Sequence, residues 1–95
     1  MAGRVRSRVR VRGLVQGVYF RQSTRRAAEA AGVAGWVRNL ADGSVEALFE
    51  GAEDAVAEVV GFCRVGPADA RVHTVEVTRE APRGITGFAI HESAG

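Results

Sequence analysis

The residues best suited to binding or catalysis lie in one stretch, 12–21. In this stretch glycines flank a short loop, and an arginine follows the loop. Gly13 and Gly17 allow the backbone to turn tightly or to adopt a positive φ. From Gln16 onward, the backbone presents N–H groups that the first turn of a helix leaves without partners. Arg21 falls at the start of that helix, where its planar guanidinium can bind two oxygens of a phosphate. The stretch therefore predicts an anion-binding cradle; the alternative is an ordinary strand-to-helix turn with a solvated arginine.

Length and composition exclude several other classes of protein. A chain of 95 residues is long enough for one hydrophobic core and too short for two, so we expect a single domain over residues 1–95. Hydrophobic residues make up 46% and charged residues 25%, which argues against a disordered chain. No run approaches the roughly 18 apolar residues of a membrane span, and no apolar segment follows the basic N-terminus as in a signal peptide. We therefore expect a cytoplasmic protein.

Residue types that bind metals or form covalent intermediates are scarce. Cys63 is the single cysteine, which excludes an internal disulfide and a cysteine metal cluster. His73 and His91 lie outside any metal-ligand pattern, so no metal site is expected. All 13 basic residues are arginine, which excludes a Schiff-base lysine and the lysine of a nucleotide-binding phosphate loop. The net charge of +2 suits a small anionic substrate and does not by itself require nucleic acid.

Hydrophobic periodicity predicts the elements that position the cradle. Residues 4–12 alternate arginine with valine or serine, which is typical of a half-buried strand. From about Phe20 the period changes to that of a helix, which Gly32 ends as a C-terminal cap. The Asp-Gly pair at 42–43 lies between two β-prone runs, 35–41 and 44–50, and predicts a hairpin.

The second half of the chain predicts another helix and two more strands. The helix covers about 53–64, with Val56, Val59, Val60 and Cys63 as its apolar stripe. A strand follows at 71–80, and because Val72 is out of parity with the later valines, we expect a bulge or a start nearer Thr74. Residues 88–90 predict a short closing strand. The order β-α-β-β-α-β with an extra C-terminal strand indicates an α+β, ferredoxin-like sandwich, an antiparallel sheet with two helices on one face.

Two segments together resemble the signature segments of the acylphosphatase family. Residues 13–21 read Gly-Leu-Val-Gln-Gly-Val-Tyr-Phe-Arg, and residues 35–46 read Gly-Trp-Val-Arg-Asn-Leu-Ala-Asp-Gly-Ser-Val-Glu. Their sequence, order and separation all match, and a less distinctive match covers nearly the whole chain. Acylphosphatases are small hydrolases of carboxyl-phosphate anhydrides that act without a metal or cofactor. The resemblance therefore implies an acylphosphatase with no cofactor and no metal.

The resemblance also implies roles for individual residues. Arg21 resembles the arginine that binds the substrate phosphate, and Asn39 resembles the asparagine that positions the attacking water. The proximity of Asn39 to the cradle is implied by the resemblance alone. We expect a small-molecule acyl phosphate as the substrate, no nucleic acid, no membrane and a monomeric protein. The backbone that resembles the phosphate cradle is that of Gln16, Gly17, Val18, Tyr19 and Phe20.

Two alternative functions stay open. The arginines of the first strand would form a basic stripe on the open face of the sheet, where some ferredoxin-like domains bind RNA. Such recognition relies on exposed strand aromatics, which the first and fourth strands lack. The second alternative is a module that binds phosphate or a carbamoyl-phosphate-type ligand within a larger system.

The remaining polar and aromatic residues have plainer explanations than chemistry. Asp42 is expected to be a turn residue and Glu46 a solvated strand residue. Arg38 is expected to face away from the site if Asn39 faces it, because neighbouring strand residues alternate. Trp36 is expected to anchor the core or the sheet, and Cys63 to pack as a small hydrophobe.

Overall fold

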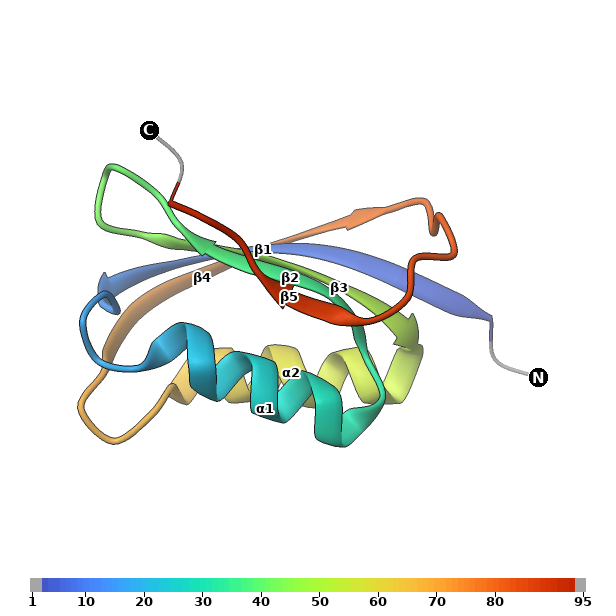
Figure 1. Cartoon of the computed structure of the whole chain (residues 1–95), viewed down its shortest axis with the longest axis horizontal. Helices are drawn as coiled ribbons and strands as arrows, with labels where there is room; N and C mark the ends of the chain where they lie inside the picture. Colours follow the sequence, from blue (N-terminus) through green and yellow to red (C-terminus); the bar gives the residue numbers. More distant parts are fainter. Residues whose placement is uncertain (1–2, 94–95) are drawn as a thin grey trace.

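The protein forms a five-stranded sheet covered on one face by two helices (Figure 1). The structure is a computed structural model that describes residues 3–93. In chain order the elements are β1 (Arg4–Leu14), α1 (Phe20–Ala31), β2 (Ala34–Asn39), β3 (Val45–Ala52), α2 (Glu53–Val65), β4 (Arg71–Glu80) and β5 (Phe88–Ile90). This order confirms the ferredoxin-like α+β prediction, short final strand included.

The strands lie in the order β4-β1-β3-β2-β5. Every neighbouring pair is antiparallel except β2 and β5, which run parallel, so the sheet is mixed and not purely antiparallel. The parallel pair arises because the chain crosses from the β4 edge to the β5 edge through residues 81–87 (Figure 1). None of the helices within residues 3–93 is long and apolar enough to cross a membrane.

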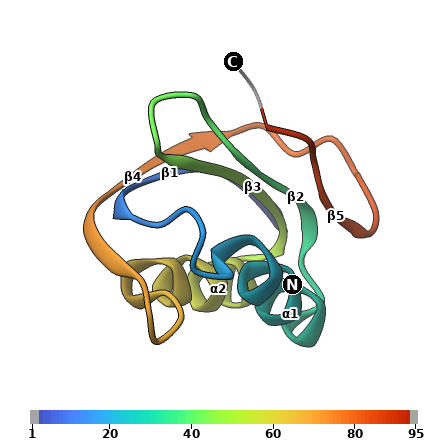
Figure 2. The same ribbon diagram turned by 60° about the vertical axis from the view of Figure 1, so that its left-hand side comes forward.

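The core lies between the sheet and the two helices, which run side by side beneath it (Figure 2). The strands contribute alternate residues, as period-two patterning requires, and the helices contribute their apolar stripes. Gly32 ends α1 in a left-handed conformation, as the sequence predicts. Burial of this apolar surface is the main force that holds the layers together. Residues of this core include Val9, Val11, Val37, Val45, Ala47, Phe49, Phe20, Ala28, Val56, Val59 and Cys63.

The predicted irregularity in β4 is confirmed as a bulge. Arg12 pairs with Thr74 but Gly13 pairs with Val72, so His73 is an extra residue on β4. The strand nevertheless begins at Arg71, ahead of the bulge. A bulge of this kind bends and twists the pair locally. It does so here at the end of β1, immediately before the predicted cradle.

The open face of the sheet carries ion pairs in place of a solvated basic stripe. Glu80 pairs with Arg6 and Arg8, and Glu46 pairs with Arg8 and Arg38. Glu46 is only 9% exposed, so its prediction as a solvated strand residue is wrong. The reason is that guanidinium groups from both neighbouring strands converge on its carboxylate.

Trp36 lies on this open face and not in the core. Its ring stacks on the ring of His91 at 5.2 Å, and the Arg38 guanidinium lies 4.9 Å from its centre. The Arg8 guanidinium approaches the same ring at 5.6 Å from β1. Trp36 therefore anchors the open face of the sheet through contacts that reach across several strands.

Candidate active site

The loop between β1 and α1 is pinned at both ends by buried side chains. Val15 is 1% exposed and Phe20 is 2% exposed, so the loop between them cannot shift freely. Gly17 and Tyr19 both adopt left-handed conformations, with φ of 74° and 64°. For a residue with a side chain, such as Tyr19, the left-handed conformation costs on the order of 1 kcal/mol. The surrounding packing must therefore enforce this conformation. Left-handed residues beside helical ones form concave backbone nests that bind anions.

The N-terminus of α1 lacks the negative charges that usually compensate a helix dipole. It has no side-chain cap and no acidic residue in its first turn. In contrast, α2 carries Glu53 and Asp54 in its first turn. The partial positive charge of the first N–H groups of α1 is therefore left for a bound anion to neutralise.

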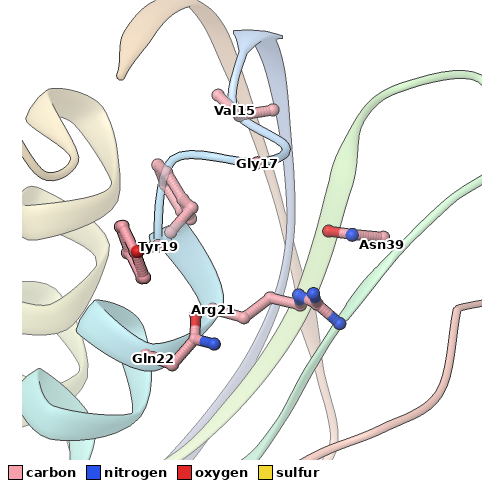
Figure 3. A pocket seen from close by; sticks show the side chains of 7 residues that line it. Val15, Gly17, Tyr19, Arg21, Gln22 and Asn39 are labelled. Carbon is pink, nitrogen blue, oxygen red and sulfur yellow. The ribbon is translucent and has the colours of Figure 1, made fainter. Parts of the chain in front are cut away.

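A pocket of about 270 Å³ opens beside this helix start. Arg21 reaches into it from α1 and Asn39 from the end of β2, and their side chains point toward one another (Figure 3). The Tyr19 ring points away from Asn39, so Tyr19 contributes to the pocket mainly through its backbone (Figure 3). The lining residues are Val15, Gly17, Tyr19, Phe20, Arg21, Gln22 and Asn39.

Asn39 faces the pocket because of its position in β2. Val37, two residues earlier, is fully buried beneath the sheet, so Asn39 points to the same side. Arg38 points away from the site, as predicted, and donates to Glu46 on the open face at 2.7 and 2.9 Å. The side-chain oxygen of Asn39 is buried and accepts no hydrogen bond from residues 3–93. A buried oxygen of this kind is normally satisfied by water or a ligand, so it can accept from a molecule in the pocket.

The Arg21 guanidinium, like the Asn39 oxygen, is available to bind a molecule in the pocket. Within the described part of the chain it forms no salt bridge, whereas many other arginines pair with carboxylates. None of the acidic residues that the structure describes lines the pocket. The site thus combines a full positive charge, a helix N-terminus and a backbone nest, all of which favour a compact anion.

Gln16 is a site residue whose side chain the sequence analysis missed. Its Nε2 donates to the carbonyl oxygens of Leu40, at 2.8 Å, and Ser44, at 2.9 Å. The family resemblance assigns only its backbone to the cradle. The two acceptors lie 24 and 28 residues away along the chain, so no local pattern could have indicated them.

The remaining candidate groups lie outside the pocket. Asp42 is a turn residue, as predicted: its carboxylate accepts the hydroxyl and the N–H of Ser44, which lower the pKa of that carboxyl. Cys63 is buried in the core, and burial raises the pKa of its thiol to about 12, so it is not a nucleophile. Residues 3–93 contain no group of three or more His, Cys, Asp or Glu side chains that could hold a metal ion.

An α+β sandwich with an uncompensated helix N-terminus and an arginine in one pocket belongs to the class of small anion-binding domains. Comparison with known proteins gives the particular family: the acylphosphatase family model matches residues 7–90, and the chain belongs to that family. An acylphosphatase of Gloeobacter violaceus is 54% identical over 93 residues, covering 98% of this chain and 100% of that protein.

Solved structures agree with the sequence match. The acylphosphatase from Bacillus subtilis has a TM-score of 0.89 at 36% identity, covering 92% of this chain and 98% of that one. The acylphosphatase from Coxiella burnetii has a TM-score of 0.89 at 33% identity, covering 93% of each chain. The protein is therefore an acylphosphatase, an enzyme that hydrolyses acyl phosphates, as the sequence resemblance predicts.

Proposed function

We propose that Arg21 and the backbone cradle at residues 16–20 bind the substrate phosphate, and that Asn39 orients a water molecule for in-line attack on phosphorus. The observation that carries the proposal is the buried oxygen of Asn39 across the pocket from Arg21, both without a hydrogen-bond or ion-pair partner among residues 3–93. The reaction releases a carboxylate and inorganic phosphate.

The chemistry of the substrate explains why so few groups suffice. An acyl phosphate, R–CO–O–PO₃²⁻, expels a carboxylate whose conjugate acid has a pKa of about 4, so the leaving group needs no general acid. What remains is to stabilise charge on the phosphoryl oxygens, to align water with the leaving oxygen and to accept the proton of the water.

Arg21 and the cradle meet the first requirement. The guanidinium can bind two phosphoryl oxygens at once, and the N–H groups at the start of α1 can bind further oxygens. If each donor acts like a typical oxyanion-hole donor, loss of one costs about 2.7–4 kcal/mol of transition-state stabilisation.

Asn39 meets the second requirement. Its side-chain oxygen can accept a hydrogen bond from the water, and its amide group can donate one to the substrate. An amide does not take up a proton at neutral pH, so Asn39 orients the water and is not its base. Because no carboxylate, histidine or thiol of residues 3–93 lines the pocket, the proton passes in this proposal to a phosphate oxygen of the substrate.

Several broader expectations belong to the same proposal. The enzyme acts as a monomer in the cytoplasm, as one domain over residues 1–95, without a nucleic-acid partner. The pairing of Arg6, Arg8 and Arg12 with carboxylates on the open face supports the last point, since it offsets the charge that would attract phosphate backbones.

The test is hydrolysis of benzoyl phosphate in excess EDTA by the wild type, Arg21→Ala and Asn39→Ala, with folding checked by circular dichroism. We expect turnover by the wild type and loss of most activity in both folded variants. Full activity in either folded variant would remove that residue from the mechanism, and wild-type activity that requires added metal would contradict the metal-free reaction.

A further inference from the structure

We propose that the side chain of Gln16 is a positioning residue that sets the placement of Asn39 relative to the phosphate cradle. This inference rests on the proposed role of Asn39 and assigns to Gln16 a function beyond its backbone. Gln16 lies in the cradle loop and its side-chain amide reaches the hairpin turn that follows Asn39.

The strand register shows why such a link is needed. Pairing of β1 with β3 ends at Val11 with Val45, and pairing of β2 with β3 ends at Asn39 with that same Val45. The cradle loop and the 40–44 turn therefore both extend beyond the shared part of the sheet. Sheet hydrogen bonds do not fix their separation.

Gln16 bridges these two extensions. Within residues 3–93, the hydrogen bonds that join loop 15–19 to the 40–44 turn are the two donated by Gln16 Nε2, at 2.8 and 2.9 Å. One acceptor belongs to Leu40, the residue directly after Asn39. The other, the carbonyl of Ser44, also accepts the Leu40 N–H at 2.9 Å and so closes the turn. A single amide thus ties the cradle to both sides of the turn.

The chemistry makes this placement matter. Asn39 can align water only if it stays at a set distance from the phosphate held by Arg21 and the cradle, and a misplacement of about 1 Å can cost about 100-fold in rate. The nearby pair between Arg12 and Asp42 is a weak substitute for the bridge, because both side chains are about half exposed, at 45% and 47%.

The decisive experiment is a double-mutant cycle between Gln16→Met and Asn39→Ala, with kcat and KM measured on benzoyl phosphate. Methionine keeps the length of glutamine but donates no hydrogen bond. We expect Gln16→Met alone to lower kcat by about 10- to 100-fold with little change in KM or in the affinity for inorganic phosphate. In the Asn39→Ala background the same change should have little further effect, because no side chain is left to position.

The matched control is Asp42→Ala, which removes hydrogen bonds inside the same turn and the exposed ion pair with Arg12 but leaves both Gln16 side-chain donors in place. It should keep most of the wild-type kcat. An equal loss in Asp42→Ala, or a Gln16→Met effect that is just as large without Asn39, would overturn the positioning role. If Asn39→Ala alone leaves kcat unchanged, the proposed function itself fails and the inference about Gln16 fails with it.

Discussion

The carboxylate of Glu50 is fully buried and lies 3.3 Å from the guanidinium of Arg6, which is itself 6% exposed. The same carboxylate accepts backbone N–H groups from Arg83, Gly84 and Ile85 at 2.7–3.1 Å. It therefore fastens the 81–87 crossover to the middle of the sheet. Buried ions of this kind are tolerated only when their hydrogen bonds are satisfied.

This arrangement predicts a pH-dependent contribution to stability. Burial by itself would raise the pKa of Glu50, but the Arg83 and Gly84 N–H groups and the Arg4 and Arg6 side chains lower it to about 2. The folded-state pKa is then below the ordinary carboxyl value of 4.5, so the stabilisation is present above pH 4.5 and is lost as pH falls toward 2.

We expect Glu50→Gln to destabilise the protein at pH 7 by about 3 kcal/mol or more, because it removes the buried negative charge that pairs with Arg6 and accepts the N–H groups of the crossover. The difference from the wild type should narrow as pH falls from about 4.5. Urea denaturation across this pH range measures the difference in unfolding free energy. Glu76→Gln is the control, because it removes an exposed ion pair that contributes at most about 1 kcal/mol. A difference that stays constant down to pH 3 would contradict the prediction.

Arg21→Ala and Asn39→Ala should differ in their kinetic signatures. Arg21 is proposed to bind phosphate in both the ground state and the transition state, so its loss should raise KM and lower kcat. Asn39 is proposed to act on the water, so its loss should mainly lower kcat, by about 100-fold or more. Steady-state kinetics on benzoyl phosphate separates the two, and inorganic phosphate binding by calorimetry should weaken much more in Arg21→Ala than in Asn39→Ala. Small and equal effects in both variants would break the assignment.

Transfer of the proton to the substrate predicts that no nearby carboxylate is needed. Asp42 is held in its turn by Ser44, and Glu46 is held on the open face by Arg8 and Arg38. Asp42→Asn and Glu46→Gln should therefore keep flat activity between about pH 5 and 7, once their folding has been verified. Collapse of either profile would identify a protein carboxylate as the base.

Gly35 should not tolerate any side chain. Its φ is 144°, and a Cβ there would lie 1.7 Å from the Leu48 carbonyl oxygen, in the strand paired with β2. Gly35→Ala should cost at least about 3 kcal/mol of unfolding free energy. Gly61→Ala in α2 is the matched control, since a Cβ there meets no atom and should stabilise the helix by up to about 1 kcal/mol. Thermal unfolding compares the two, and similar melting temperatures would disprove the steric argument.

Local signals in the sequence determined the elements of this protein, and the family resemblance pointed to two candidate site residues. The alternation in 4–12 predicted β1, the change of period at Phe20 predicted α1, and Asp-Gly predicted the β2–β3 hairpin. These predictions succeeded because each depends on backbone preferences and side-chain spacing within a few residues. The two signature segments led to the family and, through it, to Arg21 and Asn39.

The tertiary structure decided how distant residues meet. Glu46 was predicted to be solvated, but arginines from β1 and β2 surround it. The parallel pairing of β5 with β2 depends on the crossover, which no local pattern specifies. The bridge from Gln16 to the turn after Asn39 likewise joins segments that are far apart in the chain, because the pairings of β1 and β2 with β3 both end at Val45. Spacing along a chain can predict which face a side chain occupies, but only packing determines which side chains share that face.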